Sequence, residues 1–60
     1  MRTWGEWRES LDFARGEFAS AVTFMRVAFA LERPKIERDL CVKRVREWAA
    51  EFRKRRAANV

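Results

Sequence analysis

The sequence is poor in the residues that bind metals, break helices or link chain segments covalently. It has no histidine and no tyrosine, and its single cysteine, Cys41, cannot form a disulfide within the chain. Without histidine an ordinary zinc site is not expected. One proline and two glycines leave few helix breakers in 60 residues. The composition therefore argues against a disulfide-linked or zinc-stabilised small domain. It favours helix, with no metal and no cofactor.

Candidate catalytic groups are equally scarce. The only serines are Ser10 and Ser20, and no histidine is present to activate either of them. Cys41 falls on an apolar stripe, where a free cysteine usually packs as a small hydrophobe. Glu47 and Glu51 lie four residues apart on a predicted exposed helix face, where carboxylates form ordinary ion pairs. We therefore expect no catalytic residues, no enzyme activity and no small-molecule substrate.

No segment is typical of export or of membrane insertion. Met1 leads into a charged stretch, so we expect no signal peptide. The apolar run over 19–31 is shorter than the roughly 20 residues that span a bilayer, and it contains Arg26. These features predict a cytoplasmic protein without a membrane span.

What the sequence does contain is a long apolar repeat at helical spacing. Thr3 and Glu6 have the spacing of a capping box, in which each side chain accepts a hydrogen bond from the other residue's backbone amide. Apolar residues then recur at alternating steps of three and four, which predicts one helix over about 4–32. The repeat consists of Trp4, Trp7, Leu11, Ala14, Phe18, Ala21, Met25 and Ala28.

Pro34 marks the one clear break in this pattern. Proline suits the first turn of a helix and disfavours helical angles in the residue before it, here Arg33. We predict a tight hairpin turn followed by a second helix over about 34–57, with a kinked continuous helix as the alternative. The core stripe of the second helix consists of Cys41, Val45, Trp48 and Phe52. Reversal at Arg33 places Phe18 opposite Trp48.

The hairpin does not use all the apolar surface that the sequence provides. A chain this short buries only about 60% of the surface its unfolded form exposes. The run over 18–31 has a second apolar stripe, and Trp4 and Trp7 fall opposite Arg55 and Arg56 in the antiparallel register. We therefore predict an all-α fold, a two-helix hairpin forming one domain over 1–60, that dimerises into a four-helix bundle. The candidate protein-interface residues are Trp4, Trp7, Phe24, Val27, Leu31, Ile36 and Leu40.

The charge is concentrated in the second half of the chain. Basic and acidic residues balance over 1–33, so the whole net charge of +5 lies in 34–60. A row of long cations on one helix face is suited to the phosphates of a duplex, and no aromatic side chain stands among them for stacking on single strands. The alternative is a solvated face with cations favourably placed at a helix C-terminus. The candidate nucleic-acid-binding residues are Lys35, Lys43, Arg46, Arg53, Lys54, Arg55 and Arg56.

Two functions are consistent with these patterns. The first is a small regulator that grips duplex RNA or DNA through the basic face of the second helix. The second is a protein-interaction module, such as a small phage or bacterial inhibitor, an adaptor or a subunit of a larger complex, that docks through an apolar patch near the turn. The predicted architecture resembles small two-helix hairpins that dimerise into four-helix bundles, such as plasmid copy-number regulators and some viral double-stranded-RNA binders. The likeness is one of architecture, so no functional residue is carried over.

Overall fold

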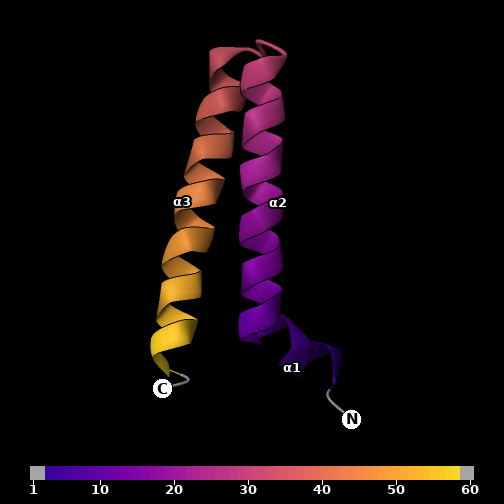
Figure 1. Cartoon of the computed structure of the whole chain (residues 1–60), viewed down its shortest axis with the longest axis vertical. Helices are drawn as coiled ribbons and strands as arrows, with labels where there is room; N and C mark the ends of the chain where they lie inside the picture. Colours follow the sequence, from indigo (N-terminus) through magenta and orange to yellow (C-terminus); the bar gives the residue numbers. More distant parts are fainter. Residues whose placement is uncertain (1–2, 59–60) are drawn as a thin grey trace.

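The computed structural model describes residues 3–58 of the chain. Its elements are three helices: α1 over Trp4–Arg8, α2 over Leu11–Ala30 and α3 over Lys35–Ala58. Helices α2 and α3 run antiparallel side by side, and α1 lies at an angle at the lower end of α2 (Figure 1). The molecule is elongated, measuring 42 × 22 × 14 Å. The predicted helical hairpin is therefore confirmed, and no strand occurs in the described residues.

The predicted capping box begins α1. The Oγ1 of Thr3 accepts a hydrogen bond from the amide of Glu6 at 3.2 Å, and the carboxylate of Glu6 accepts one from the amide of Thr3 at 3.2 Å. Two of the amides that lack a partner inside the helix are satisfied in this way.

The single helix predicted over 4–32 is divided in two at Ser10. The hydroxyl of Ser10 donates a hydrogen bond to the carbonyl of Trp7 at 2.6 Å and accepts one from the amide of Phe13 at 3.1 Å. The Ser10 side chain therefore ends α1 and caps α2. Serine at this position competes with the backbone bonds that a continuous helix needs. The break folds α1 back, so that Trp7 packs edge-to-face on Phe13 at a centroid distance of 6.4 Å. Trp7 thus has an apolar partner within the chain, which the sequence did not predict.

The turn between α2 and α3 forms a Schellman motif. Arg33 donates its amide to the carbonyl of Ala28 at 2.9 Å, and Glu32 donates to Phe29 at 3.1 Å. Glu32 adopts a φ of 52°, the left-handed conformation that glycine usually supplies at this position. The carbonyl of Pro34 then accepts hydrogen bonds from the amides of Glu37 and Arg38, so α3 begins directly after the turn. The chain therefore forms the predicted hairpin turn and not the kinked continuous helix that was the alternative.

The core between α2 and α3 is thin and lined with alanine. Ala14, Ala21 and Ala28, which recur every seven residues along α2, are the buried hydrophobic residues among the described residues. Small side chains at this spacing let two helices approach closely. The larger residues of the predicted stripe on α3 are half-buried, and Trp48 forms its edge-to-face pair with Phe13 at 6.0 Å. The sequence placed Phe18 opposite Trp48. In the described residues the aromatic partner of Trp48 on α2 is instead Phe13.

Candidate functional site

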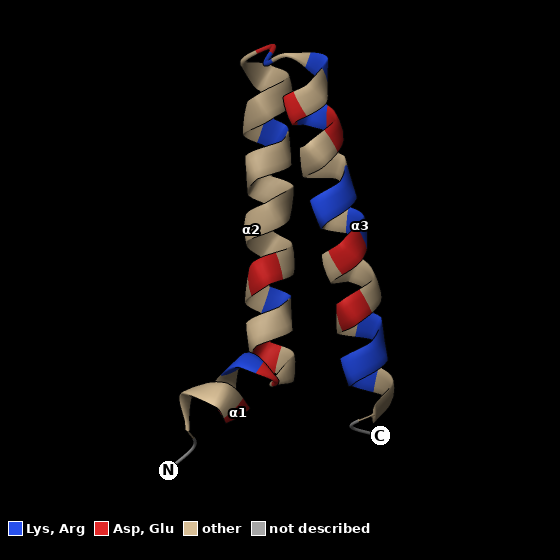
Figure 2. Cartoon of the chain, turned by 180° about the vertical axis from the view of Figure 1, so that it is seen from behind, with Lys and Arg blue, Asp and Glu red and all other residues tan. Residues whose placement is uncertain are grey.

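The predicted nucleic-acid-binding residues all lie on α3, along most of its length. Blue segments mark Lys and Arg on this helix and are densest near its C-terminal end, whereas α2 is uncharged over most of its length (Figure 2). Arg53 places its Nε 3.4 Å from the carbonyl of Ala49 on its own helix. In the part of the chain that the structure describes, the ion pairs are Arg33–Glu37 and Glu51–Arg55. The six exposed members of the predicted set are Lys35, Lys43, Arg46, Arg53, Lys54 and Arg56.

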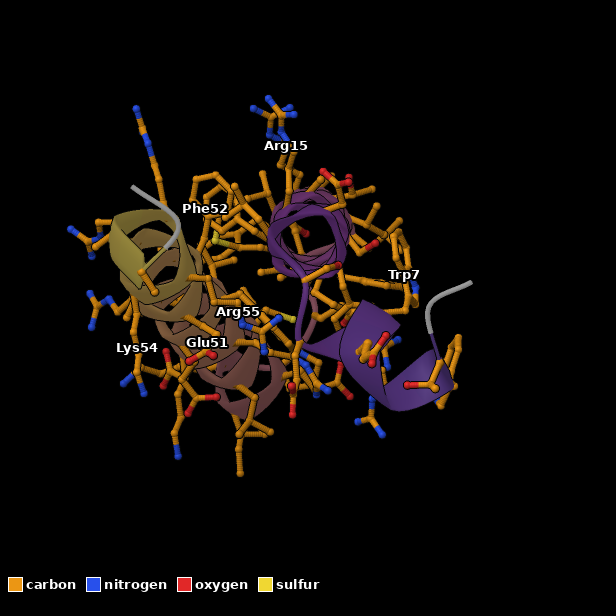
Figure 3. All side chains as sticks on the ribbon, turned by 90° about the horizontal axis from the view of Figure 1, so that it is seen from below. Trp7, Arg15, Glu51, Phe52, Lys54 and Arg55 are labelled. Atoms are coloured by element: carbon orange, nitrogen blue, oxygen red, sulfur yellow. The ribbon has the colours of Figure 1, made fainter. Side chains whose placement is uncertain are left out.

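Arg55, the seventh member, is used within the fold. Its Nη1 donates to the carbonyl of Arg8 at 2.8 Å and to the carbonyl of Ser10 at 3.0 Å, where α1 ends. Its Nε pairs with Glu51 at 2.9 Å, and its guanidinium lies 5.9 Å from the ring centroid of Trp48. Figure 3 shows Arg55 directed inward between the helices, in contrast to Lys54, which points outward. Arg55 therefore fastens α1 to the hairpin.

The acidic residues of α3 are unevenly distributed around the exposed cations. Asp39 and Glu47 line a shallow hollow on the outer surface of the helix together with Lys43 and Arg46. Glu51 is engaged by Arg55. Because Asp39 and Glu47 stand beside Lys43, they weaken the positive potential at the middle of the outer surface. The C-terminal part of the helix carries no acid after Glu51.

The hairpin has two distinct sides, which we call the α1 side and the far side. The α1 side carries α1 and a groove of about 330 Å³ that includes Ser20, Ala21, Phe24 and Cys41 in its lining. The far side carries a groove lined by Leu11, Asp12, Arg15, Phe52 and Arg56. Figure 3 shows Arg15 pointing away from α1 and Trp7.

The predicted protein-interface residues are all exposed in the single chain. Phe24 is 69% exposed and Ile36 is 71% exposed, whereas Trp7, which packs on Phe13, is 40% exposed. The residues near the turn form what we call the tip patch: Phe24, Val27, Leu31, Ile36 and Leu40.

Phe29 is a further exposed aromatic side chain on α2. The guanidinium of Arg38 covers one face of its ring at 5.4 Å from the centroid. This contact places Arg38 on the inner edge of α3, and it was not predicted because it depends on the register of the two helices. Arg38 is half-buried by the contact.

The ion pair at the turn between Arg33 and Glu37 shifts the pKa of the Glu37 carboxyl group. Arg33 donates to both oxygens of Glu37, at 2.7 and 3.1 Å. These hydrogen bonds lower the pKa of Glu37 below its ordinary value, with the attraction of the positive charge adding to the effect. The pair is solvent-exposed and joins the turn to the first turn of α3.

No cluster of metal ligands occurs among residues 3–58, and no helix there is long and apolar enough to cross a membrane. No family model, curated protein or solved structure matches the chain. The function is therefore argued from the two surfaces of the molecule, the cations of α3 and the tip patch.

Proposed function

We propose that this protein is a small non-enzymatic regulator that binds duplex nucleic acid through the six exposed cations of the predicted set on α3, to which Arg44 on the α1 side does not belong. The observation that carries the proposal is that six of the seven predicted cations are exposed and form no ion pair with another described residue. Cations in this state gain free energy at a duplex, because their contacts with phosphates release condensed counterions.

The shape of α3 favours a duplex over a single strand. Its 24 residues make a rod of about 36 Å, close to the length of one turn of duplex. The aromatic side chains of this helix, Trp48 and Phe52, are half-buried toward α2 and are not placed to stack on bases. Contacts made only with phosphates carry little sequence preference, so binding to unrelated duplexes should be similar.

A second copy of the chain completes this proposal by covering the tip patch. The buried core of the described residues consists of three alanines, while large apolar side chains such as Phe24 and Leu31 stay exposed. Burying such side chains is the main driving force of association, and a two-fold dimer is its commonest outcome. Two hairpins packed in this way form the four-helix bundle expected from the sequence.

The nucleic-acid proposal is tested by titrating unrelated duplexes with the parent and with Arg46→Ala and Arg53→Ala. Each substitution should weaken binding about equally on every duplex and reduce the salt slope by about one unit. Arg44→Ala removes the same charge on the α1 side and is the matched control, because Arg44 lines the groove that contains Phe24. Weak binding that is identical for the parent and for both α3 variants would remove the support for this function.

The dimer is tested by sedimentation. The parent should sediment at about twice the chain mass of 7.2 kDa at micromolar concentration. The double variant Phe24→Ser/Leu31→Ser should sediment as a single chain, because it makes the tip patch polar. Alkylation of Cys41, which lines the groove beside Phe24, gives a second readout and should slow as the parent dimerises. A folded parent that sediments at the mass of one chain would contradict the dimer.

The exposure of the tip patch supports docking on a protein partner as the second candidate function. Ile36 and Phe24 remain about as exposed as Trp4, an unusual number of free large apolar side chains for so small a surface. In that case Phe24→Ser should abolish partner binding with little dependence on salt, and Arg53→Ala should leave it unchanged. A monomeric parent without affinity for duplex would favour this function over the first.

A further inference from the structure

The far-side groove brings cations from two helices to one surface. Arg15 comes from α2 and Arg56 from α3, and both line this groove with Leu11 and Phe52 between them. Arg15 projects from the hairpin on the side opposite α1 (Figure 3). The far side therefore carries positive charge on both of its edges.

The helical repeat extends each edge toward the turn. On α3, Arg46, Arg53 and Arg56 follow one another at steps of seven and three, so the exposed Arg46 and Arg53 lie on the same side of the helix as Arg56. On α2, Arg26 follows Arg15 by eleven residues, which is close to three full turns. Both α2 arginines are exposed. The far side thus has two antiparallel rows of arginine, one on each helix.

Several acidic residues of the hairpin lie on the α1 side. Glu17 lines the α1-side groove, and Glu51 is held by Arg55 on that same side. Glu9 lies beside α1, in a hollow that also contains Trp48. Asp12 is the single acid among the residues that line the far-side groove, and Asp39 and Glu47 line the hollow on α3 that includes Arg46. The far side is therefore the more positive side of the hairpin.

We infer that the phosphate-binding surface spans both helices on the far side, with Arg15 and Arg26 of α2 acting together with the arginines of α3. This inference rests on the proposed function and adds residues that lie outside α3. Packed helices have axes about 8–10 Å apart, and a duplex major groove is about 12 Å wide. Two rows of long side chains at this separation can reach phosphates on both strands. A single strand offers only one row of phosphates.

The test compares Arg15→Ala and Arg26→Ala with Arg44→Ala, the control of equal charge on the α1 side. A duplex of about 20 base pairs is titrated at several salt concentrations, and circular dichroism establishes that each variant is folded. Arg15→Ala and Arg26→Ala should each reduce the salt slope by about one unit, as Arg53→Ala does, while Arg44→Ala leaves it unchanged. Arg15→Gln provides the same readout if the alanine variant is unstable.

The outcomes separate this inference from the proposal on which it rests. If the parent binds and Arg53→Ala weakens binding while both α2 variants match the parent, the two-helix surface is wrong and the α3 surface stands. If Arg44→Ala weakens binding as much as Arg15→Ala does, the attraction is diffuse and the far side has no special role. A parent that binds an acidic protein but no duplex overturns both.

Discussion

Replacing Arg55 by alanine should destabilise the protein, because this residue fastens α1 to the hairpin. The guanidinium donates to two carbonyls, at 2.8 and 3.0 Å, pairs with Glu51 and lies against Trp48. A hydrogen bond from a charged donor contributes about 1.5–3 kcal/mol, and a cation–π contact about 0.5–1 kcal/mol at an exposed site. Because the side chain is 20% exposed and sits at one end of the molecule, we expect a net loss of about 2 kcal/mol.

The loss is measured by thermal unfolding followed by circular dichroism at neutral pH. For a domain of this size about 2 kcal/mol corresponds to a fall in Tm of roughly 8–16 °C. Arg53→Ala is the matched control, because Arg53 lies two residues earlier and is exposed. It should change Tm by less than about 4 °C, since exposed substitutions usually cost under about 0.5 kcal/mol. Equal melting of the Arg55→Ala variant and the parent would refute the role assigned to Arg55.

Three further predictions concern the turn and the core. Glu32→Gly should stabilise the hairpin by about 0.5–1 kcal/mol, because glycine relieves the left-handed conformation at φ 52° but is more flexible in the unfolded chain; an unchanged Tm would contradict this. Ala14→Leu should cost about 1–3 kcal/mol, because Ala14 is 0% exposed between α2 and α3, whereas the exposed Ala19→Leu should be neutral; similar melting of the two would refute the close packing. Glu37 has a lowered pKa when folded, so its contribution is present above the unfolded-state pKa of about 4.3 and is lost as the pH falls through the folded value. The parent should therefore melt above Glu37→Gln at neutral pH and together with it in acid, and a gap that persists in acid would count against the ion pair.

The hairpin could be predicted because its signals are local. The capping box at Thr3 and the break at Pro34 each depend on a few neighbouring residues, and both are present in the structure. The seven-residue spacing of alanine also identified the line along which α2 meets α3. These features follow from the period of the helix and the chemistry of single residues.

The division at Ser10 was missed because the apolar repeat runs through it without a gap. Serine followed by Asp12 in the first turn is a helix start signal, but the heptad pattern favoured a continuous helix. At the break the carbonyl of Ser10 also accepts a hydrogen bond from Arg55, which is 45 residues away. A pattern of neighbouring residues does not reveal a contact between residues so far apart in the sequence.

The exposure of cations was predictable along one helix and unpredictable where two helices meet. Helical spacing identified six of the exposed cations of α3, including Arg46 and Arg53. Helical spacing also placed Arg55 among the binding residues. It gives the direction of a side chain around the helix axis, but it does not show that the carbonyl of Arg8 lies in that direction. The sequence did not indicate Arg15, because its position in one groove with Arg56 depends on how α2 and α3 pack.

The salt dependence of duplex binding by the parent protein tests the central claim most directly. The logarithm of the association constant should fall linearly with the logarithm of the salt concentration, with a slope of about −0.9 for each phosphate contact on DNA. With the six exposed cations of the predicted set on α3, we expect a slope of about −3 to −5 and the same slope on unrelated duplexes. Binding that is absent at low salt, or that does not change with salt, would contradict the account.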